Sequence, residues 1–173
     1  QNRKATDISY QSFKAKRPAS FTFHAYLLKE YRNRWFVLGK KGDGKNMMTL
    51  ALDRILAINT SETPYIGNAT VDMSNYFKDV IGVTVSESLQ PETVKLWVHK
   101  SNAPYVLTKP LHHSQKLIEE KGDGIVITIS VQLNFELERE ILGFCDSIKV
   151  LSPTKLVNRI KNKIDLQTKL YHK

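Results

Sequence analysis

The residues most suggestive of chemistry lie within the stretch 34–55. Gly39, Gly44 and Lys45 match the spacing G-x-x-x-x-G-K of a phosphate-binding loop, in which backbone N–H groups hold phosphates between a strand and a helix. Asn46 follows the lysine, whereas such loops place a Ser or Thr hydroxyl there for Mg²⁺. The stretch therefore carries an incomplete phosphate-loop pattern, and a strand–turn–strand hairpin is the competing interpretation.

A repeated tetrapeptide favours the hairpin. Lys-Gly-Asp-Gly occurs at 41–44 and again at 121–124, where it stands between two apolar segments. Asp-Gly supplies the positive φ that a tight hairpin turn requires. We therefore predict strand–turn–strand over 34–55, in which Lys45 is a turn lysine and the residue of chemical interest becomes Arg54.

Aromatic and basic side chains upstream could join Arg54 in an anion-binding pocket. Alternation over 21–28 places His24 and Tyr26 on one face of a strand, and Tyr10 could reach them from a neighbouring strand. Arg offers a planar donor fork, Tyr a stacking surface and His a titratable donor, a set suited to phosphates and bases. We predict ligand contacts from Tyr10, His24, Tyr26, Arg32, Arg34 and Arg54, within a positive field from Lys14, Lys16 and Arg17.

Structural roles compete with these assignments. An ion pair of Asp53 with Arg54 or with a neighbouring lysine would make the arginine structural, and His24 could equally be a satisfied buried histidine. We expect Trp35 and Phe36 to lie in the core because both are large and apolar.

Catalysis, metals and cofactors have little support. His112 and His113 are adjacent, and in a strand they would point to opposite faces, with no cysteine or acid pair beside them. No arrangement of serine, histidine and acid forms a recognisable catalytic motif. We expect no metal site, no cofactor and no enzymatic activity.

Charge is distributed unevenly along the chain. The net charge is +9, and residues 1–54 hold twelve Lys or Arg against four Asp or Glu, whereas residues 55–148 hold seven against twelve. The basic front and the basic tail could meet an anion such as nucleic acid. Cys145 is the single cysteine, so we expect a reducing, cytoplasmic location. No apolar run reaches the roughly 18 residues of a membrane span, so we expect no membrane contact.

A change of pattern near residue 79 predicts two domains, 1–78 and 79–173. The second shows the order β-α-β-β-α-β-α, which favours a ferredoxin-like α+β sandwich. Its predicted elements are strands at 83–85 and 94–98, a helix capped by Asn102, a hairpin over 114–133, a helix capped by Asn134, an edge strand at 148–151, and a last helix with Leu156, Ile160 and Ile164 facing inward.

The chain resembles the WYL-domain transcriptional regulators. Trp35-Phe36-Val37-Leu38 is similar to the family's Trp-Tyr-Leu signature, with Phe in place of Tyr, and Leu52-Asp53-Arg54-Ile55 is similar to its Leu-Asp-Arg-Ile element. Tyr10 and His24-Ala25-Tyr26 match earlier family strands. Ala25 stands where the family usually has proline, and Met48 where it often has arginine. The second half resembles the WCX extension through Pro104-Tyr105, residues 109–114 and Val150-Leu151-Ser152-Pro153.

The resemblance implies a fold and a function. WYL domains adopt a small Sm/SH3-like β-barrel and are thought to sense nucleotides or nucleic acids, so a ligand-sensing, dimeric regulatory module is expected. A winged helix-turn-helix usually precedes them, so contact with double-stranded DNA would come from a domain before Gln1. The alternative is a stand-alone nucleic-acid-binding accessory module of a defence or nuclease complex.

Overall fold

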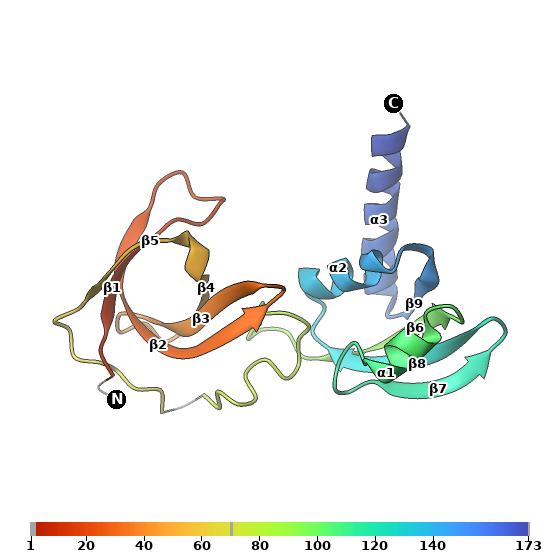
Figure 1. The fold of residues 1–173 in the computed structure, drawn as a ribbon, viewed down its shortest axis with the longest axis horizontal. Helices are drawn as coiled ribbons and strands as arrows, with labels where there is room; N and C mark the ends of the chain where they lie inside the picture. The colour runs from red at the N-terminus through yellow and green to blue at the C-terminus, as the bar shows by residue number, and fades with distance from the viewer. Residues whose placement is uncertain (1–2, 70, 173) are drawn as a thin grey trace. The chain divides into compact units, whose positions relative to one another are not determined.

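The computed structural model describes residues 3–69 and 71–172. The chain divides into two compact units, residues 1–76 and 77–173 (Figure 1). Each unit contains one antiparallel sheet, and the described part of the second adds three α-helices. The α+β class predicted from the sequence is thus confirmed, and the predicted boundary at 78/79 lies close to this division.

The first unit is a strongly curled five-stranded sheet. Its order is β4-β3-β2-β1-β5, and the two edge strands are joined through a single 3₁₀ turn, η1 (Leu52–Arg54). Such a short connection brings one end of β4 close to the start of β5, and Figure 1 shows the resulting curl. Among the described residues no pairing joins β4 to β5, so the predicted closed Sm/SH3-like barrel is not shown. The strands are β1 (Thr6–Tyr10), β2 (Ala19–Tyr31), β3 (Arg34–Lys41), β4 (Met47–Ala51) and β5 (Ile55–Thr60).

The stretch 34–55 is a hairpin, as predicted. β3 and β4 pair antiparallel from Phe36 opposite Ala51 to Lys40 opposite Met47. A strand therefore follows the glycine-rich turn, where a phosphate loop would need a helix. The phosphate-loop alternative is excluded by this geometry.

A small cluster of apolar side chains forms the core of the first unit. Ile8, Phe23, Val37 and Leu50 are buried there. The prediction of a core Trp35 was wrong, since its side chain is 52% exposed. In its pairing with β2, β1 reaches residues 19–23 of that strand. The β2–β3 ribbon therefore extends past β1 and leaves Trp35 uncovered.

The second unit has the ferredoxin-like element order. Its sheet is antiparallel in the order β7-β8-β6-β9, which is the strand order expected when a β-α-β-β-α-β chain forms one sheet with two crossovers. The elements are β6 (Glu92–His99), α1 (Ala103–Thr108), β7 (Lys116–Lys121), β8 (Gly124–Val131), α2 (Phe135–Gly143), η2 (Cys145–Ser147), β9 (Ile148–Ser152) and α3 (Thr154–Tyr171).

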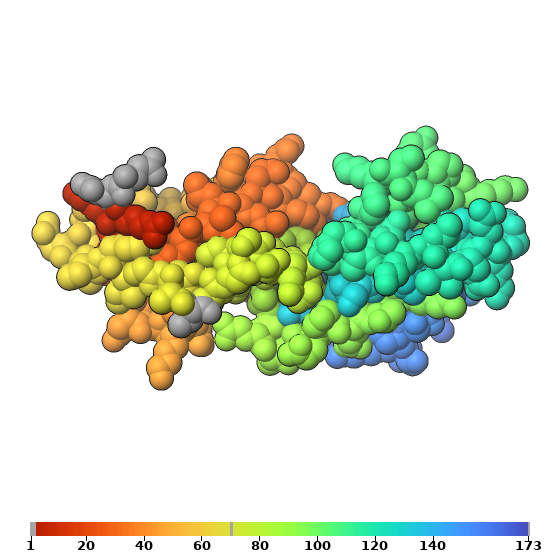
Figure 2. Space-filling model, turned by 90° about the horizontal axis from the view of Figure 1, so that it is seen from below, coloured from red at the N-terminus to blue at the C-terminus, as the bar shows by residue number. Residues whose placement is uncertain are grey.

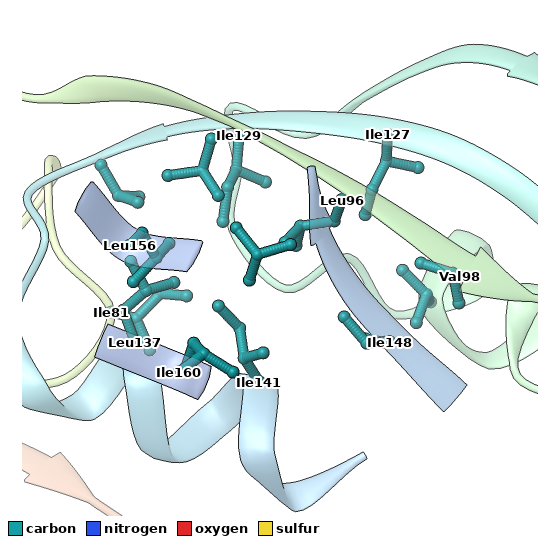
Figure 3. Packing of buried hydrophobic residues seen from close by; sticks show 14 of the residues in the cluster. Ile81, Leu96, Val98, Ile127, Ile129, Leu137, Ile141, Ile148, Leu156 and Ile160 are labelled. Carbon is teal, nitrogen blue, oxygen red and sulfur yellow. The ribbon is translucent and has the colours of Figure 1, made fainter. Parts of the chain in front are cut away.

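Helices α2 and α3 cover one face of this sheet and form its large core. Figure 3 shows Leu137 and Ile141 of α2 and Leu156 and Ile160 of α3 directed at the strands. Ile164, predicted to face inward, is 46% exposed, because α3 extends beyond the layer that it packs on (Figure 1).

Two details of the second unit differ from the prediction. Residues 83–85 form no strand, since this segment is held by side chains, with the Val83 N–H and Thr84 hydroxyl donating to the Glu136 carboxylate. Asn134 does cap α2, accepting from the Leu137 N–H at 2.9 Å, whereas Asn102 makes no capping bond at α1.

Candidate functional site

Four of the six predicted ligand residues lie in two places of the first unit, and Tyr10 and Arg32 lie elsewhere in it. Arg54 and Arg34 lie around the 3₁₀ turn η1, next to the loop 11–18 that joins β1 to β2. His24 and Tyr26 instead contact Ile66, which belongs to the described segment 61–69 and 71–76 that we call the strap. The structure therefore does not assemble the six residues into one pocket, and each place is described separately.

The first place is a stack of Arg54 on Phe13, which we call the platform. The guanidinium carbon of Arg54 lies 4.2 Å from the centroid of the Phe13 ring. Phe13 is 78% exposed, an unusual state for a large apolar ring. The Arg54 Nε is buried and has no hydrogen-bond partner. An exposed ring backed by a cation is a suitable surface for a nucleobase.

Backbone hydrogen bonds position the platform. The Gln11 N–H donates to the Arg54 carbonyl at 3.1 Å, which joins the loop to the 3₁₀ turn. Within the loop the Ala15 N–H donates to the Ser12 carbonyl, so Phe13 lies in a tight turn and is directed away from the core. Lys14, Lys16 and Arg17 follow, and all three are exposed. They surround the platform with positive charge that can attract phosphates.

The other predicted arginines have different surroundings. The Arg34 Nε lies 3.1 Å from a carboxylate oxygen of Asp53, and both side chains are about half exposed. Asp53 therefore pairs with Arg34, whereas the competing hypothesis paired it with Arg54. Arg32 occupies the β2–β3 turn with φ of 52°, and its guanidinium lies 5.8 Å from the Tyr31 ring centroid.

Tyr10 packs inward. Its side chain is partly buried and packs against the cluster that contains Ile8 and Phe23. His24 is fully buried and contacts the strap. Tyr10 therefore does not share a site with His24, in contrast to the predicted grouping.

The second place is formed by the strap and β2. The Tyr26 hydroxyl donates to the Ile66 carbonyl at 3.1 Å, and the Tyr65 hydroxyl donates to the Ala25 carbonyl at 2.8 Å. The Ile66 N–H donates to His24 Nδ1 at 3.2 Å. These reciprocal bonds fasten the strap along the strand, and Figure 2 shows residues 61–69 (yellow) running beside the orange β2–β3 surface.

A cavity of about 440 Å³ adjoins this contact. It is lined by Arg3, Lys4, Ala25, Tyr26, Tyr65, Asn68 and Met73. The rings of Tyr26 and Tyr65 meet edge to face with centroids 6.3 Å apart. Burial raises the pKa of Tyr26 above its ordinary value, and the neighbouring Tyr65 raises this pKa further. The Tyr26 phenol therefore stays a neutral donor at physiological pH. We call this cavity the strap pocket.

Two aromatic residues in these places were missed from the sequence. Phe13 stands next to the run Lys14-Ala15-Lys16-Arg17, and an aromatic residue beside a basic run was the available signal. Tyr65 lies in a polar connection next to Pro64 and carried no signal. Its role follows from a contact across 40 residues of sequence.

The His-x-Ser pairs of the second unit have a local structural role. His99 Nδ1 lies 2.8 Å from the Ser101 hydroxyl, His112 Nδ1 lies 2.7 Å from the Ser114 hydroxyl, and in each pair the serine N–H also donates to the same nitrogen at 3.3 Å. The same geometry at two turns indicates a local turn motif, in which the serine two residues further along the chain binds the histidine Nδ1. The absence of an enzymatic activity stays a prediction.

The adjacent histidines do not point apart as predicted. The ring centroids of His112 and His113 are 4.1 Å apart, because these residues lie in a turn and not in a strand. Within residues 3–69 and 71–172, no group of three or more His, Cys, Asp or Glu side chains is placed to hold a metal ion. In the same ranges, none of the helices combines the length and apolarity needed to cross a bilayer.

Solved structures match the chain at low sequence identity. A crystal structure of a CRISPR Cas-related protein matches with a TM-score of 0.53 and 11% identity, covering 98% of this chain and 48% of that one. The proteasome accessory factor B/C (PafBC) of Arthrobacter aurescens matches with a TM-score of 0.39 and 14% identity, covering 91% of this chain and 24% of that one. The chain thus spans less than half of each of these proteins.

Family models match most of the sequence. No curated protein matches it. The WYL domain model matches residues 1–60, and the WCX domain model matches residues 90–165. The first match covers the curled sheet, and the second begins just before β6 and ends within α3. The chain is therefore a WYL-domain protein, in which a WYL domain is followed by a WCX domain.

Proposed function

We propose that the WYL domain binds single-stranded nucleic acid or a nucleotide at the platform. The observation that carries this proposal is the stack of Arg54 on the exposed Phe13 ring, with Arg54 Nε lacking a partner. Base stacking on such a ring is tolerant of sequence and contributes about 1–3 kcal/mol per base. The exposed cations of the loop 11–18 supply phosphate contacts, which add affinity that falls with salt.

Binding at the platform would serve regulation. We propose that the chain is the ligand-sensing and oligomerisation module of a bacterial transcriptional regulator, acting as a homodimer. A DNA-reading domain outside this chain would contact double-stranded DNA, and the ligand would bias its geometry. The curled sheet would then correspond to the small Sm/SH3-like barrel of WYL domains.

A second function is a nucleic-acid-binding accessory module of a defence or nuclease complex. The observation that suggests this second function is the fold similarity to a CRISPR Cas-related protein. Sedimentation of the chain with and without a short oligonucleotide separates the two. A change in association state on binding supports the regulatory module, whereas binding with an unchanged state supports the accessory module.

Substitution of Arg54 tests the platform. Arg54→Ala should weaken binding of a short oligothymidylate by about tenfold, because the stacked cation and one phosphate contact are lost. Affinity is measured by fluorescence anisotropy at two salt concentrations, and the melting temperature is followed in parallel.

Asp53→Asn is the matched control, since it changes the neighbouring charge without touching the stack. It should bind as well as the wild type or slightly better. Unchanged affinity in Arg54→Ala would refute the platform, and a large fall in melting temperature would assign Arg54 a structural role.

A further inference from the structure

The strap pocket contains polar chemistry that the platform does not use. Its strap lies within residues 61–89, between the segments matched by the WYL and WCX models. Asn68 forms both amide contacts with the backbone of Val71, so its side chain shapes the strap. The pocket is therefore a feature built by this chain's own connecting segment against β2.

A buried histidine packs against Tyr65, a lining residue of the pocket, and one of its ring nitrogens lacks a partner. His24 is fully buried, and its Nδ1 accepts the Ile66 N–H, so in the neutral ring the proton lies on Nε2. The Nε2 atom is buried and makes no hydrogen bond. A buried donor without an acceptor is costly, by about 1–3 kcal/mol, and in native proteins such groups usually have a partner. The His24 ring contacts Tyr65, which lines the pocket, with centroids 5.8 Å apart.

The lining defines what the pocket can hold. Arg3 and Lys4 are exposed cations at its surface, and no acidic residue lines it. The Tyr26 and Tyr65 hydroxyls are engaged with backbone carbonyls, so these residues offer their rings to a ligand. A volume of about 440 Å³ falls in the range of small-molecule sites. An aromatic ring that carries an anionic group matches both the tyrosine rings and the two cations.

We propose that the strap pocket is a second binding site, for a mononucleotide or a similarly sized aromatic anion. The ring packs against Tyr26 and Tyr65, and the anionic group binds Arg3 and Lys4. This site is separate from the platform, so it goes beyond the proposed binding of a nucleic-acid strand. Its ligand would stabilise the strap, which is the segment that leads into the second unit.

Calorimetric titration of the chain with AMP, adenosine and inorganic phosphate tests this site. AMP should bind at least about tenfold more tightly than adenosine or phosphate, because only AMP carries both the ring and the anion. The variant Arg3→Gln/Lys4→Gln should lose about tenfold in AMP affinity. These two side chains are exposed, so the fold should be retained, as checked by circular dichroism.

Substitutions of Tyr65 in the strap pocket and of Phe13 in the platform distinguish the two sites. Tyr65→Leu should weaken AMP binding by about tenfold, and Tyr65→Phe, which keeps the ring, by less. Phe13→Ala should leave AMP binding within about twofold while weakening oligothymidylate binding. Hydrogen exchange of residues 61–69 should slow when AMP is bound.

The outcomes are distinct for the two sites. The pocket is refuted if AMP does not bind the wild type at about millimolar concentration, or if its binding is lost in Phe13→Ala and kept in the pocket variants. AMP binding without oligothymidylate binding would instead refute the platform and leave the pocket standing.

Discussion

Two arginines near η1 differ in what surrounds them. Arg34 is half exposed and paired with Asp53, so its charge is partly neutralised. An exposed pair of this kind contributes about 0–1 kcal/mol to stability. Arg54 is stacked on Phe13 and keeps Nε without a partner. Of the two, Arg54 is therefore the arginine available for a ligand.

His112 provides a prediction on pH at the residue scale. Burial lowers the pKa of His112 below its ordinary value of 6.5, and the neighbouring His113 lowers this pKa further, against smaller opposing effects of the Lys78 backbone and Asp79. The folded state therefore binds fewer protons than the unfolded state, and the stability that depends on neutral His112 is lost as pH falls below about 6.5.

The free energy of unfolding of the second unit should decrease between about pH 7.5 and pH 5.5, and the decrease should be smaller in His112→Gln. Urea denaturation followed by Trp97 fluorescence measures it. His172→Gln, at an exposed position near the end of the chain, is the control. An equal pH dependence in His112→Gln and wild type would contradict the role of His112.

At the scale of elements, Asn134 joins helix α2 to the segment that precedes β6. Its side-chain oxygen accepts from the Leu137 N–H. Its side-chain NH₂ group donates to the backbone carbonyls of Ile81 and Thr84 at 2.9 and 3.1 Å. The side chain is buried, so its removal would leave two backbone acceptors and one helix N–H unpaired.

Asn134→Ala should cost about 2–3 kcal/mol, as the sum of a lost cap and two lost buried hydrogen bonds. Asn102→Ala should cost less than about 0.5 kcal/mol, because Asn102 makes no capping bond. Urea denaturation compares the two variants. Equal losses in the free energy of unfolding would show that the hydrogen bonds of the Asn134 side chain do not determine the effect.

Local patterns predicted most elements, and long-range contacts account for the failures. Repeated Asp-Gly turns and the Asn134 cap are local signals, and the hairpins and α2 were predicted correctly. The segment 83–85 has a strand-like sequence, but side chains more than 50 residues away hold its backbone. Within the site, the pairing of Asp53 with Arg34 and the contact of Tyr65 with Ala25 depend on register and strap position, which spacing alone does not contain.

At the scale of the whole molecule, the two units differ in core size. Among the described residues, seventeen buried hydrophobic residues form the main cluster of the second unit, against four in that of the first. Because buried apolar area is the main source of stability, we expect the first unit to unfold more readily. Such an element is also suited to respond to a ligand.

The chain's two tryptophans, Trp35 in the first unit and Trp97 in the second, can report on each unit. In Trp97→Phe, the remaining Trp35 should report a transition at lower urea than Trp97 reports in Trp35→Phe. Circular dichroism reports on both units, so in each variant it should show both unfolding transitions. Coincident fluorescence transitions would mean that the units unfold as one.

The most direct test of the nucleic-acid site is the affinity of Phe13 variants for a short oligothymidylate. Phe13 is 78% exposed, so its replacement should not disturb the core. Fluorescence anisotropy should show Phe13→Tyr binding like the wild type and Phe13→Ala binding about tenfold more weakly, because only the first keeps a ring for stacking. Equal affinities for wild type, Phe13→Tyr and Phe13→Ala would contradict the platform.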